Sequence, residues 1–380
     1  MTESIQQLRL GLIGVGGVCG AVHYPGLSRI PGVEIAALCD PDESLLSQRQ
    51  KEWNVAATTT DVTEFLRHEL DAVVIATPNR LHRGLIEAVL SADCHVLCEK
   101  PLGMNLAETI DIYRTAMASG KRHMTAFTYR FVPGMRYVKH LVDSGALGTI
   151  RHARIQRLQD WGEHAIGWRQ YQAEAGLGEL GDMGIHRIDY AEDLLGPIRS
   201  VCSSMKQLVP RNHRLDGTQC PPQDVEDWVA WIAEFEEGAT CVFEMGKLTK
   251  GRSSKGEHDL AELNGTEASV IYNLHTPHEV LFAKRGDPNE QGHRGEAYQV
   301  LPVPEEFLTL PGSPRNPAEG DPARTFRYDQ AWEFVCAIRE NRSCVPSFYH
   351  GMRAQAVAEA VVEADKDRRW VDIEAVPSLS

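Results

Sequence analysis

Three side chains have types and spacing suited to moving a proton on and off an alcohol oxygen. Lys100 follows the short apolar run 96–98 and one glutamate, and Pro101 prevents that run from continuing as a strand. Asp182 and His186 stand four residues apart, a spacing that places both on one helix face. A carboxylate can orient an imidazole and hold its charge, which suits general acid–base catalysis. Taken alone, however, this pair is more simply a helix cap followed by a surface histidine.

A glycine-rich turn follows the first predicted strand, at 8–13, and precedes a predicted helix. In the run Gly14-Val15-Gly16-Gly17, Gly14 permits a tight turn, and Gly16 lets the backbone approach a pyrophosphate. Cys19 occupies the third position of this fingerprint, where glycine or alanine is usual. A bare Gly-x-Gly is often only a turn, but a strand before it and a helix after it favour a dinucleotide site.

The ends of the next strands carry polar residues. Asp40 ends the second predicted strand, where a carboxylate accepts hydrogen bonds from ribose hydroxyls and repels a 2′-phosphate. This favours NAD over NADP, although an Asp-Pro turn is the simpler alternative. Thr77, Asn79 and His82 follow the third strand and are placed to line the cofactor cleft, or else to form a turn that caps the next helix.

An aromatic and polar cluster precedes Asp182. Trp161, His164, Trp168 and Arg169 suit a sugar ring, because indole packs on C–H faces while polar groups bind hydroxyls. An isolated tryptophan is more often part of a core. We expect no metal, since no third ligand at zinc-like spacing accompanies His164 and His186.

Strands and helices alternate as far as residue 127, which predicts a doubly wound parallel sheet. Beyond it, a long strand at 149–159 and a hairpin formed by 225–235 and 239–245 predict a largely antiparallel sheet. The expected fold class is α/β, with a Rossmann domain at 1–127 and a carboxyl-terminal α+β domain at 128–380. Helices are predicted at 134–144, 182–195, 328–341 and 351–367, and further strands at 268–273 and 279–284. The segment 285–324 is rich in Gly, Pro and charge, and predicts a long loop that is functional, an interface or mobile.

Composition sets wider bounds. A chain of 380 residues exceeds the usual size of one core, and its net charge of −14 argues against nucleic acid or an anionic membrane as the main partner. The nine cysteines are dispersed without a Cys-x-x-Cys pair, which predicts reduced thiols and a cytoplasmic location. We expect no signal peptide and no membrane span.

In combination these motifs resemble the Gfo/Idh/MocA oxidoreductases, over nearly the whole chain. The matching stretches are Gly14-Val15-Gly16-Gly17, Ala76-Thr77-Pro78-Asn79 with His82, Glu99-Lys100-Pro101, Tyr129-Arg130-Phe131 with Pro133, Trp168-Arg169, Gly181-Asp182-Met183-Gly184-Ile185-His186 with Asp189, and Pro346-Ser347-Phe348. Two positions depart from the family pattern: Cys19, and Thr128, where relatives commonly carry Asn.

The resemblance implies a role for each matched position. The catalytic group would be Lys100, Asp182 and His186. The residues implied to bind NAD are Gly14, Val15, Gly16, Gly17, Asp40, Thr77, Asn79, His82, Glu99, Lys100, Trp168 and Arg169. Those expected to bind substrate are Lys100, Arg130, His164, Asp182 and His186.

The predicted function is an NAD-dependent dehydrogenase that oxidises a ring secondary hydroxyl of an unphosphorylated sugar, a levoglucosan-like anhydrosugar or an inositol-like cyclitol. His186 would be the base and Lys100 would stabilise the charge on the oxygen, although the two can exchange roles. The alternatives are a glycosidase that retains NAD and oxidises its substrate transiently, and a sugar-sensing regulator without catalysis. An open sheet face in the second domain predicts a homodimer or homotetramer.

Overall fold

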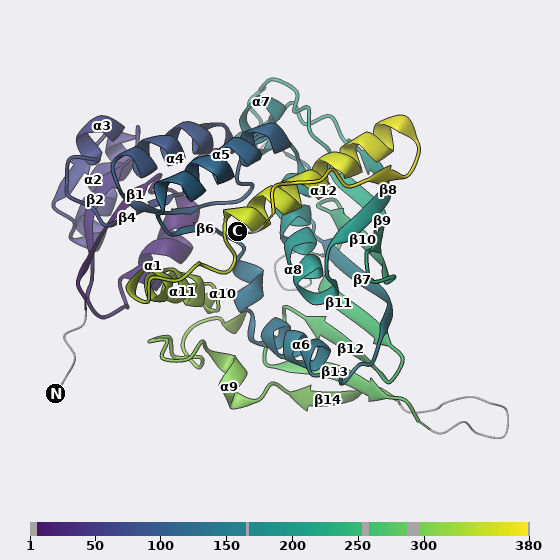
Figure 1. Cartoon of the computed structure of the whole chain (residues 1–380). Helices are drawn as coiled ribbons and strands as arrows, with labels where there is room; N and C mark the ends of the chain where they lie inside the picture. Colours follow the sequence, from purple (N-terminus) through teal and green to yellow (C-terminus); the bar gives the residue numbers. More distant parts are fainter. Residues whose placement is uncertain (1–5, 165–166, 253–257, 287–296, 379–380) are drawn as a thin grey trace, which may run out of the picture. The chain divides into compact units, whose positions relative to one another are not determined.

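The computed structural model describes residues 6–164, 167–252, 258–286 and 297–378, which form two compact units (Figure 1). Unit 1 comprises Met1–Thr128, Thr309–Gln355 and Val376–Ser380, and unit 2 comprises Tyr129–Leu308 and Ala356–Ala375. This division differs from the expected one, in which all residues after 127 formed the second domain. The segment 309–355 groups with the amino-terminal sheet because its helix buries Phe334 and Val335 in the core of that sheet.

The sheet of unit 1 has six parallel strands in the order β3-β2-β1-β4-β5-β6. This confirms the predicted doubly wound sheet. The central strands are almost entirely apolar and buried, as expected when helices cover both faces. In chain order the strands are β1 (Leu8–Ile13), β2 (Val33–Cys39), β3 (Ala57–Thr59), β4 (Ala72–Ile75), β5 (His95–Cys98) and β6 (His123–Thr125).

Helices pack on both sides of this sheet. The helices α1 and α11 contact each other, while α4 and α5 lie side by side (Figure 1). In α4, the buried apolar residues are Ile86, Val89 and Leu90. The helices are η1 (a π-helix, Cys19–His23), α1 (Tyr24–Leu27), α2 (Glu43–Trp53), α3 (Val62–Phe65), η2 (Asn79–Leu81), α4 (His82–Ser91), α5 (Leu106–Ser119), η3 (Thr128–Phe131), α10 (Pro322–Thr325), α11 (Tyr328–Arg339) and the start of α12 (Phe348–Asp367).

The sheet of unit 2 has nine strands in the order β14-β13-β12-β11-β7-β10-β9-β8-β15. Only β7 and β10 pair in parallel, so the predicted largely antiparallel sheet is confirmed. The strands are β7 (Ile150–Leu158), β8 (Ile198–Lys206), β9 (Trp228–Phe235), β10 (Thr240–Gly246), β11 (His258–Gly265), β12 (Ala268–Asn273), β13 (Glu279–Lys284), β14 (Gln299–Pro302) and β15 (Val371–Asp372).

The two faces of this sheet differ. Trp231 and Phe243 stack on the covered face at 4.5 Å between ring centroids, and α8 and α12 lie over it (Figure 1). On the opposite face Ile232 and Val242 are exposed. The helices of unit 2 are α6 (Pro133–Asp143), η4 (Trp168–Gln170), α7 (Gln172–Ala175), η5 (a π-helix, Leu180–Gly184), α8 (Ile185–Leu195), α9 (Glu305–Leu308) and the rest of α12.

The segment 285–324 is less irregular than predicted, because it contains β14, α9 and α10; residues 287–296 of this predicted loop lie outside the described part.

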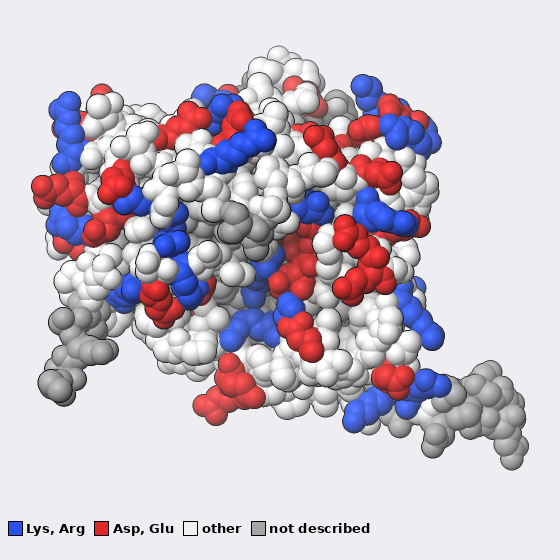
Figure 2. Space-filling view, in the orientation of Figure 1, with Lys and Arg blue, Asp and Glu red and all other residues white. Residues whose placement is uncertain are grey.

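Acidic and basic side chains are interspersed on the face shown in Figure 2. Among the described helices, none has the length and apolar character needed to cross a bilayer.

Candidate active site

The glycine loop joins β1 to η1 at the carboxyl end of the parallel sheet. Gly14 has a φ of +82°, and a Cβ there would lie 2.6 Å from the carbonyl oxygen of Ala76, so only glycine fits. Apart from chain neighbours, no described atom lies within 4 Å of a Cβ placed on Gly16 or Gly17. The loop therefore has close packing on its sheet side and open space where a pyrophosphate would approach.

Asp40 holds the glycine loop to the end of β2. Its Oδ2 accepts a hydrogen bond from the Val15 amide at 2.9 Å, and its Oδ1 accepts one from the Asp42 amide at 3.0 Å. A carboxylate has about four acceptor sites, so capacity remains for ribose hydroxyls. Cys19 is buried in the core of unit 1, and burial raises the pKa of its thiol to about 12, which makes it a packing residue.

Lys100 lies just beyond β5 and is positioned through its neighbour Glu99. The carboxylate of Glu99 accepts a hydrogen bond from the Lys100 amide at 3.2 Å and lies 2.9 Å from Nε2 of His23. Only 1% of the His23 side chain and 13% of the Glu99 side chain are exposed. This buried pair connects the Lys100 loop to η1, the helix that follows the glycine loop.

His82 supports the same loop from the other side. Its Nδ1 lies 2.9 Å from the carbonyl oxygen of Pro101, and its Nε2 lies 3.1 Å from that of Thr77. Burial lowers the pKa of His82, although both carbonyls and Glu99 favour its charged form. The ring is fully buried, and these two contacts position Thr77 and Pro101.

Asp182 and His186 lie on one helical stretch with a change of pitch between them. Asp182 belongs to the π-helix η5, whereas His186 lies in the first turn of α8. A π turn closes hydrogen bonds from i to i+5, so the four-residue spacing does not align the two side chains as an α-helix would. Asp182 Oδ1 lies 3.7 Å from Nε of Arg169, whose guanidinium stacks 4.4 Å from the Trp168 ring.

The ring of His186 packs against a buried chain of aromatic and charged groups. Tyr129 contacts it edge to face at 4.7 Å between centroids, and the Arg187 guanidinium lies 4.2 Å from the Tyr129 ring. Asp259 on β11 binds Arg187 at 2.5 Å and Arg157 at 2.9 Å, and all three side chains are buried. Burial raises the pKa of Asp259, but the two arginines outweigh this and the net direction is downward.

A second buried ion pair lies next to η5. Lys247 Nζ is 3.8 Å from Oε2 of Glu179, the residue immediately before this π-helix. Burial raises the pKa of Glu179 to about 8; the charge of Lys247 opposes the rise and that of Asp182 adds to it. Glu226 fixes the backbone here, because its carboxylate accepts hydrogen bonds from the amides of Gly178 and Leu180 at 2.9 Å each.

The segment 160–164 is anchored to the end of β10. The Lys247 carbonyl oxygen accepts hydrogen bonds from the amides of Trp161 at 3.1 Å and Gly162 at 2.8 Å. Lys250 pairs with both Asp160 and Glu163, so the two carboxylates are partly neutralised. His164 is exposed next to them, as a substrate contact requires.

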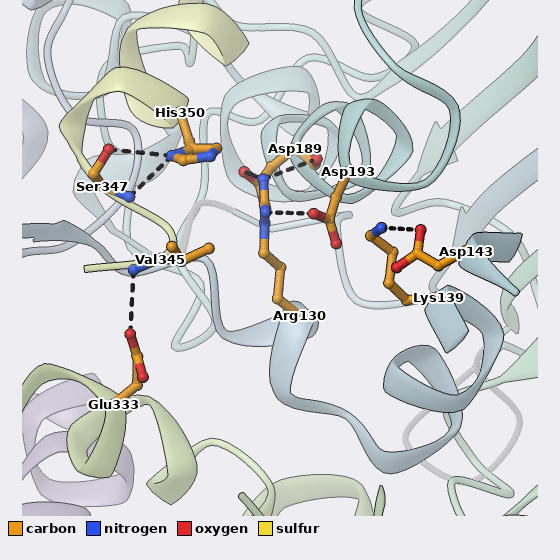
Figure 3. A network of polar contacts seen from close by, with 9 residues as sticks. All are labelled: Arg130, Lys139, Asp143, Asp189, Asp193, Glu333, Val345, Ser347 and His350. Carbon is orange, nitrogen blue, oxygen red and sulfur yellow. Dashed lines mark hydrogen bonds and ion pairs between the residues drawn. The ribbon is translucent and has the colours of Figure 1, made fainter. Parts of the chain in front are cut away.

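Arg130 does not have the exposed guanidinium that the sequence predicts for a substrate-binding residue. It makes a bidentate ion pair with Asp189, at 2.7 and 2.8 Å, and a further pair with Asp193 at 2.7 Å (Figure 3). The side chain is 8% exposed, so its charge is committed to holding η3 against α8.

Comparison with known proteins now identifies the family. Residues 8–127 match the oxidoreductase family with an NAD-binding Rossmann fold, and residues 135–271 match the Gfo/Idh/MocA carboxyl-terminal domain. The chain belongs to the Gfo/Idh/MocA family. It is therefore an oxidoreductase with NAD as its cofactor, which confirms the resemblance, the enzyme class and the cofactor expected from the motifs.

Similarity to levoglucosan dehydrogenases extends over nearly the full length, and similarity to a D-glucoside dehydrogenase over about half of the chain. Levoglucosan dehydrogenase of Pseudarthrobacter phenanthrenivorans is 29% identical, over 99% of this chain and 100% of the relative. D-glucoside 3-dehydrogenase of Escherichia coli is 32% identical, over 52% of this chain and 56% of the relative. A solved levoglucosan dehydrogenase in complex with NADH and levoglucosan has a TM-score of 0.87 and 27% identity, with 97% of this chain and 100% of that chain covered.

Proposed function

We propose that this protein is an NAD-dependent dehydrogenase that oxidises a ring secondary hydroxyl of an unphosphorylated sugar, anhydrosugar or cyclitol. The observation that carries the proposal is the position of Lys100. It follows the carboxyl end of β5 in the sheet that also carries the glycine loop, and buried histidines hold its loop on both sides. In open α/β sheets this end of the strands is where ligands bind.

The residues of unit 1 fit the dinucleotide. The open backbone of Gly16 and Gly17 would bind the pyrophosphate, Asp40 the adenosine ribose, and Thr77, Asn79 and Glu99 the remainder of the cleft wall. When bound, NAD⁺ supplies a nicotinamide ring that accepts a hydride from carbon. We keep Trp168 and Arg169 as cofactor-binding residues because they form one of the motifs that the chain shares with the family.

The protein side chains manage the hydroxyl proton. We assign His186 as the base, because an imidazole exchanges a proton near neutral pH. Lys100 donates a hydrogen bond to the reacting oxygen and stabilises the negative charge that develops there. Asp182 orients Lys100 and His186 through its negative charge. Lys100 and His186 can exchange roles in this scheme, and pH profiles of the two variants described below distinguish the assignments.

The substrate assignment rests on the segment around Trp161 and on the relatives. Trp161 and Trp168 offer flat apolar faces, and His164 offers a polar group for hydroxyls. Asp160 and Glu163 outnumber Lys250, which leaves the segment net negative and disfavours a phosphorylated sugar. Relatives that act on levoglucosan and D-glucosides support a pyranose, with C3 of a glucose-like ring as first choice.

An absorbance assay at the NADH band tests this function directly. The substrates are levoglucosan, D-glucose, a methyl glucoside, myo-inositol and glucose 6-phosphate, each offered with NAD⁺. Lys100→Met and His186→Ala should each lower kcat about 100-fold or more, whereas His186→Ala should keep its affinity for NADH. Turnover of the phosphorylated sugar alone would contradict the substrate class, and glycoside cleavage without NADH accumulation would favour the NAD-retaining glycosidase.

We also propose that the open sheet face of unit 2 joins two copies of the chain, giving a dimer or a tetramer. Ile232, Val242 and Leu281 are exposed on it, and exposed apolar residues on a sheet face favour a protein partner. Val242→Arg should then reduce the sedimenting mass at micromolar concentration. A monomeric parent protein would contradict this proposal.

We place the protein in the cytoplasm because its cysteines are dispersed thiols.

A further inference from the structure

Unit 1 contains a cavity at the end of its sheet that lies away from the glycine loop. Its walls come from the last turns of α5, from residues 121–123 at the start of β6, and from the segment 343–350. In a parallel sheet the start of β6 is opposite to the ends of β1 and β5, where Gly14 and Lys100 lie. The cavity is therefore separate from the proposed dinucleotide site.

The size and the apolar wall of the cavity suit a compact organic molecule. Its volume is about 260 Å³, slightly below the range of about 300–1,000 Å³ typical of drug-sized ligands. Tyr113 and Ala116 are buried and form part of its wall, while Met117 and Val345 line it with 41% and 51% of their surface exposed. These side chains offer an apolar surface to the body of a ligand.

The backbone fixes the tautomers of two histidines in the cavity wall. Nδ1 of His123 accepts from the Phe348 amide at 3.2 Å, and Nδ1 of His350 accepts from the Ser347 amide at 3.0 Å (Figure 3). An amide can only donate, so each ring carries its proton on Nε2. Burial also lowers the pKa of His123 to about 4, which keeps that ring neutral.

The charged residues of the wall are all cationic. Lys121 and Arg122 line the cavity, and no carboxylate does so among the described residues. Lys121 pairs with Asp93, but that carboxylate is 89% exposed, and such surface pairs contribute only about 0–1 kcal/mol. Arg122 binds Asn341 through one terminal nitrogen, while its Nε is buried without an acceptor in the described part of the chain. The guanidinium as a whole lines the cavity, so it would bind an incoming acceptor through its terminal nitrogens, since Nε is closed off from solvent.

We propose that this cavity binds a small organic carboxylate with a compact apolar body. The carboxylate would accept hydrogen bonds from Arg122 and His123, and the body would pack on Tyr113 and Met117. In a chain with a net charge of −14, a cavity whose charged residues are all cationic selects for an anion. A single arginine suits a carboxylate better than a doubly charged phosphate, which usually draws several.

The cavity wall continues directly to the loop that carries Lys100. The Ser347 carbonyl oxygen accepts a hydrogen bond from Thr125 at 3.1 Å. A Cβ on Gly351 would lie 2.6 Å from Thr125 Oγ1 and 2.9 Å from Leu102 Cδ2, so this backbone packs tightly two residues beyond Lys100. An occupant that shifts 343–350 is therefore expected to change kcat. This second step rests on the proposed function, whereas binding itself does not.

Calorimetry on the full chain with saturating NADH tests the binding step. The probes are 3-phenylpropionate and its neutral match 3-phenylpropanamide, and we expect the carboxylate to bind about tenfold tighter or more. Met117→Glu should weaken carboxylate binding about tenfold, whereas the similarly sized Met117→Gln should change it little. Arg122→Met should also weaken it. Arg114→Met, an equal charge change on an exposed part of α5 outside the cavity, should not.

Each outcome decides one part of the proposal. Equal affinity for acid and amide, or equal affinity in Met117→Glu and Met117→Gln, would overturn the anion site, as would no binding of either probe at millimolar concentration. Phenyl phosphate binding more tightly than the carboxylate would overturn the choice of head group. Carboxylate binding that leaves kcat unchanged would overturn the link to Lys100 alone, and absence of turnover with any sugar would remove the proposed function without touching the binding result.

Discussion

Lys100 and His186 are proposed for the same reaction, but the protein holds them in different ways. The Lys100 loop of unit 1 is fixed by neighbours that the chain brings together at one sheet edge: Glu99, His23 and His82. In unit 2, His186 packs on Tyr129, and a buried ion pair between Arg187 and a distant strand holds that ring in place. One support is mainly hydrogen bonds to backbone, and the other is a network of charges.

The difference matters because the two supports fail differently. A buried ion pair costs desolvation energy that only the complete set of partners offsets, so the loss of one partner leaves an uncompensated charge. A single hydrogen bond contributes only about 0.5–1.5 kcal/mol to stability, so the fold can tolerate its loss more easily. We therefore expect changes in the support of His186 to unfold unit 2, and changes in the support of Lys100 to alter catalysis.

The largest expected effect comes from Asp259→Asn. It removes the carboxylate that Arg187 and Arg157 share, and breaking a buried pair in this way costs about 3–5 kcal/mol. Thermal unfolding should show a clearly lower Tm. The control is Glu262→Gln on the same strand, whose pair with Arg154 is partly exposed and should cost less than about 1 kcal/mol. Similar losses in both variants would show that the buried network does not hold His186.

A smaller effect, which depends on pH, is expected from Glu179. Its pKa is raised to about 8 by burial, so between the usual carboxyl range and pH 8 the folded state binds more protons than the unfolded state. Stability contributed by this group is therefore lost as pH rises through about 8. The free energy of unfolding of Glu179→Gln, relative to that of the parent, should therefore rise by a few kcal/mol as the pH increases from 5 to 9. A pH-independent difference in Tm would contradict this, and exposed Glu236→Gln is the control.

The sequence predicts some strands and helices of the fold and not others. The parallel sheet was predictable because apolar strands alternate with helices, and the bounds of β1 coincide with those expected. The strands β8 and β11 were not predicted, since polar residues such as Ser203 and Asp259 interrupt the apolar alternation of their covered faces. The π-helix η5 also escaped prediction, because no sequence rule distinguishes its five residues from an α-helical turn.

The candidate site was predictable only where motifs are contiguous. Tyr129 lies in a recognised motif, and Arg187 directly follows His186, so both could have been found as supports. Asp259 and Lys247 are far from the motifs in sequence, and only strand pairing brings them near η5 and α8. The acidic partners of Arg130 on α8 are likewise visible only in the fold.

In unit 1, replacement of Asp40 should change the preference for NAD over NADP. Asp40→Ser with Pro41→Arg removes the carboxylate that repels a 2′-phosphate and adds a cation to bind it. The ratio of kcat/KM for NAD to that for NADP should fall about 10- to 100-fold, while Tm changes little. Equal efficiency with both cofactors in the parent enzyme would refute the role of Asp40. A large loss of Tm would mean that its hydrogen bond to Val15 is mainly structural.

The smallest expected effect concerns the His23–Glu99 pair. His23→Ala removes the group that lies 2.9 Å from the Glu99 carboxylate, so Glu99 can turn away from the Lys100 amide. We expect kcat to fall about tenfold, because a displaced donor stabilises the reacting oxygen less well. The affinity for NADH should fall less than kcat does, because the contacts proposed for Gly16, Gly17 and Asp40 stay in place. His23→Gln keeps an N–H donor and should recover most of the lost activity. If His23→Gln and His23→Ala lose kcat equally while Tm falls in both, the pair serves folding alone, and the supports of Lys100 and His186 are then of one kind.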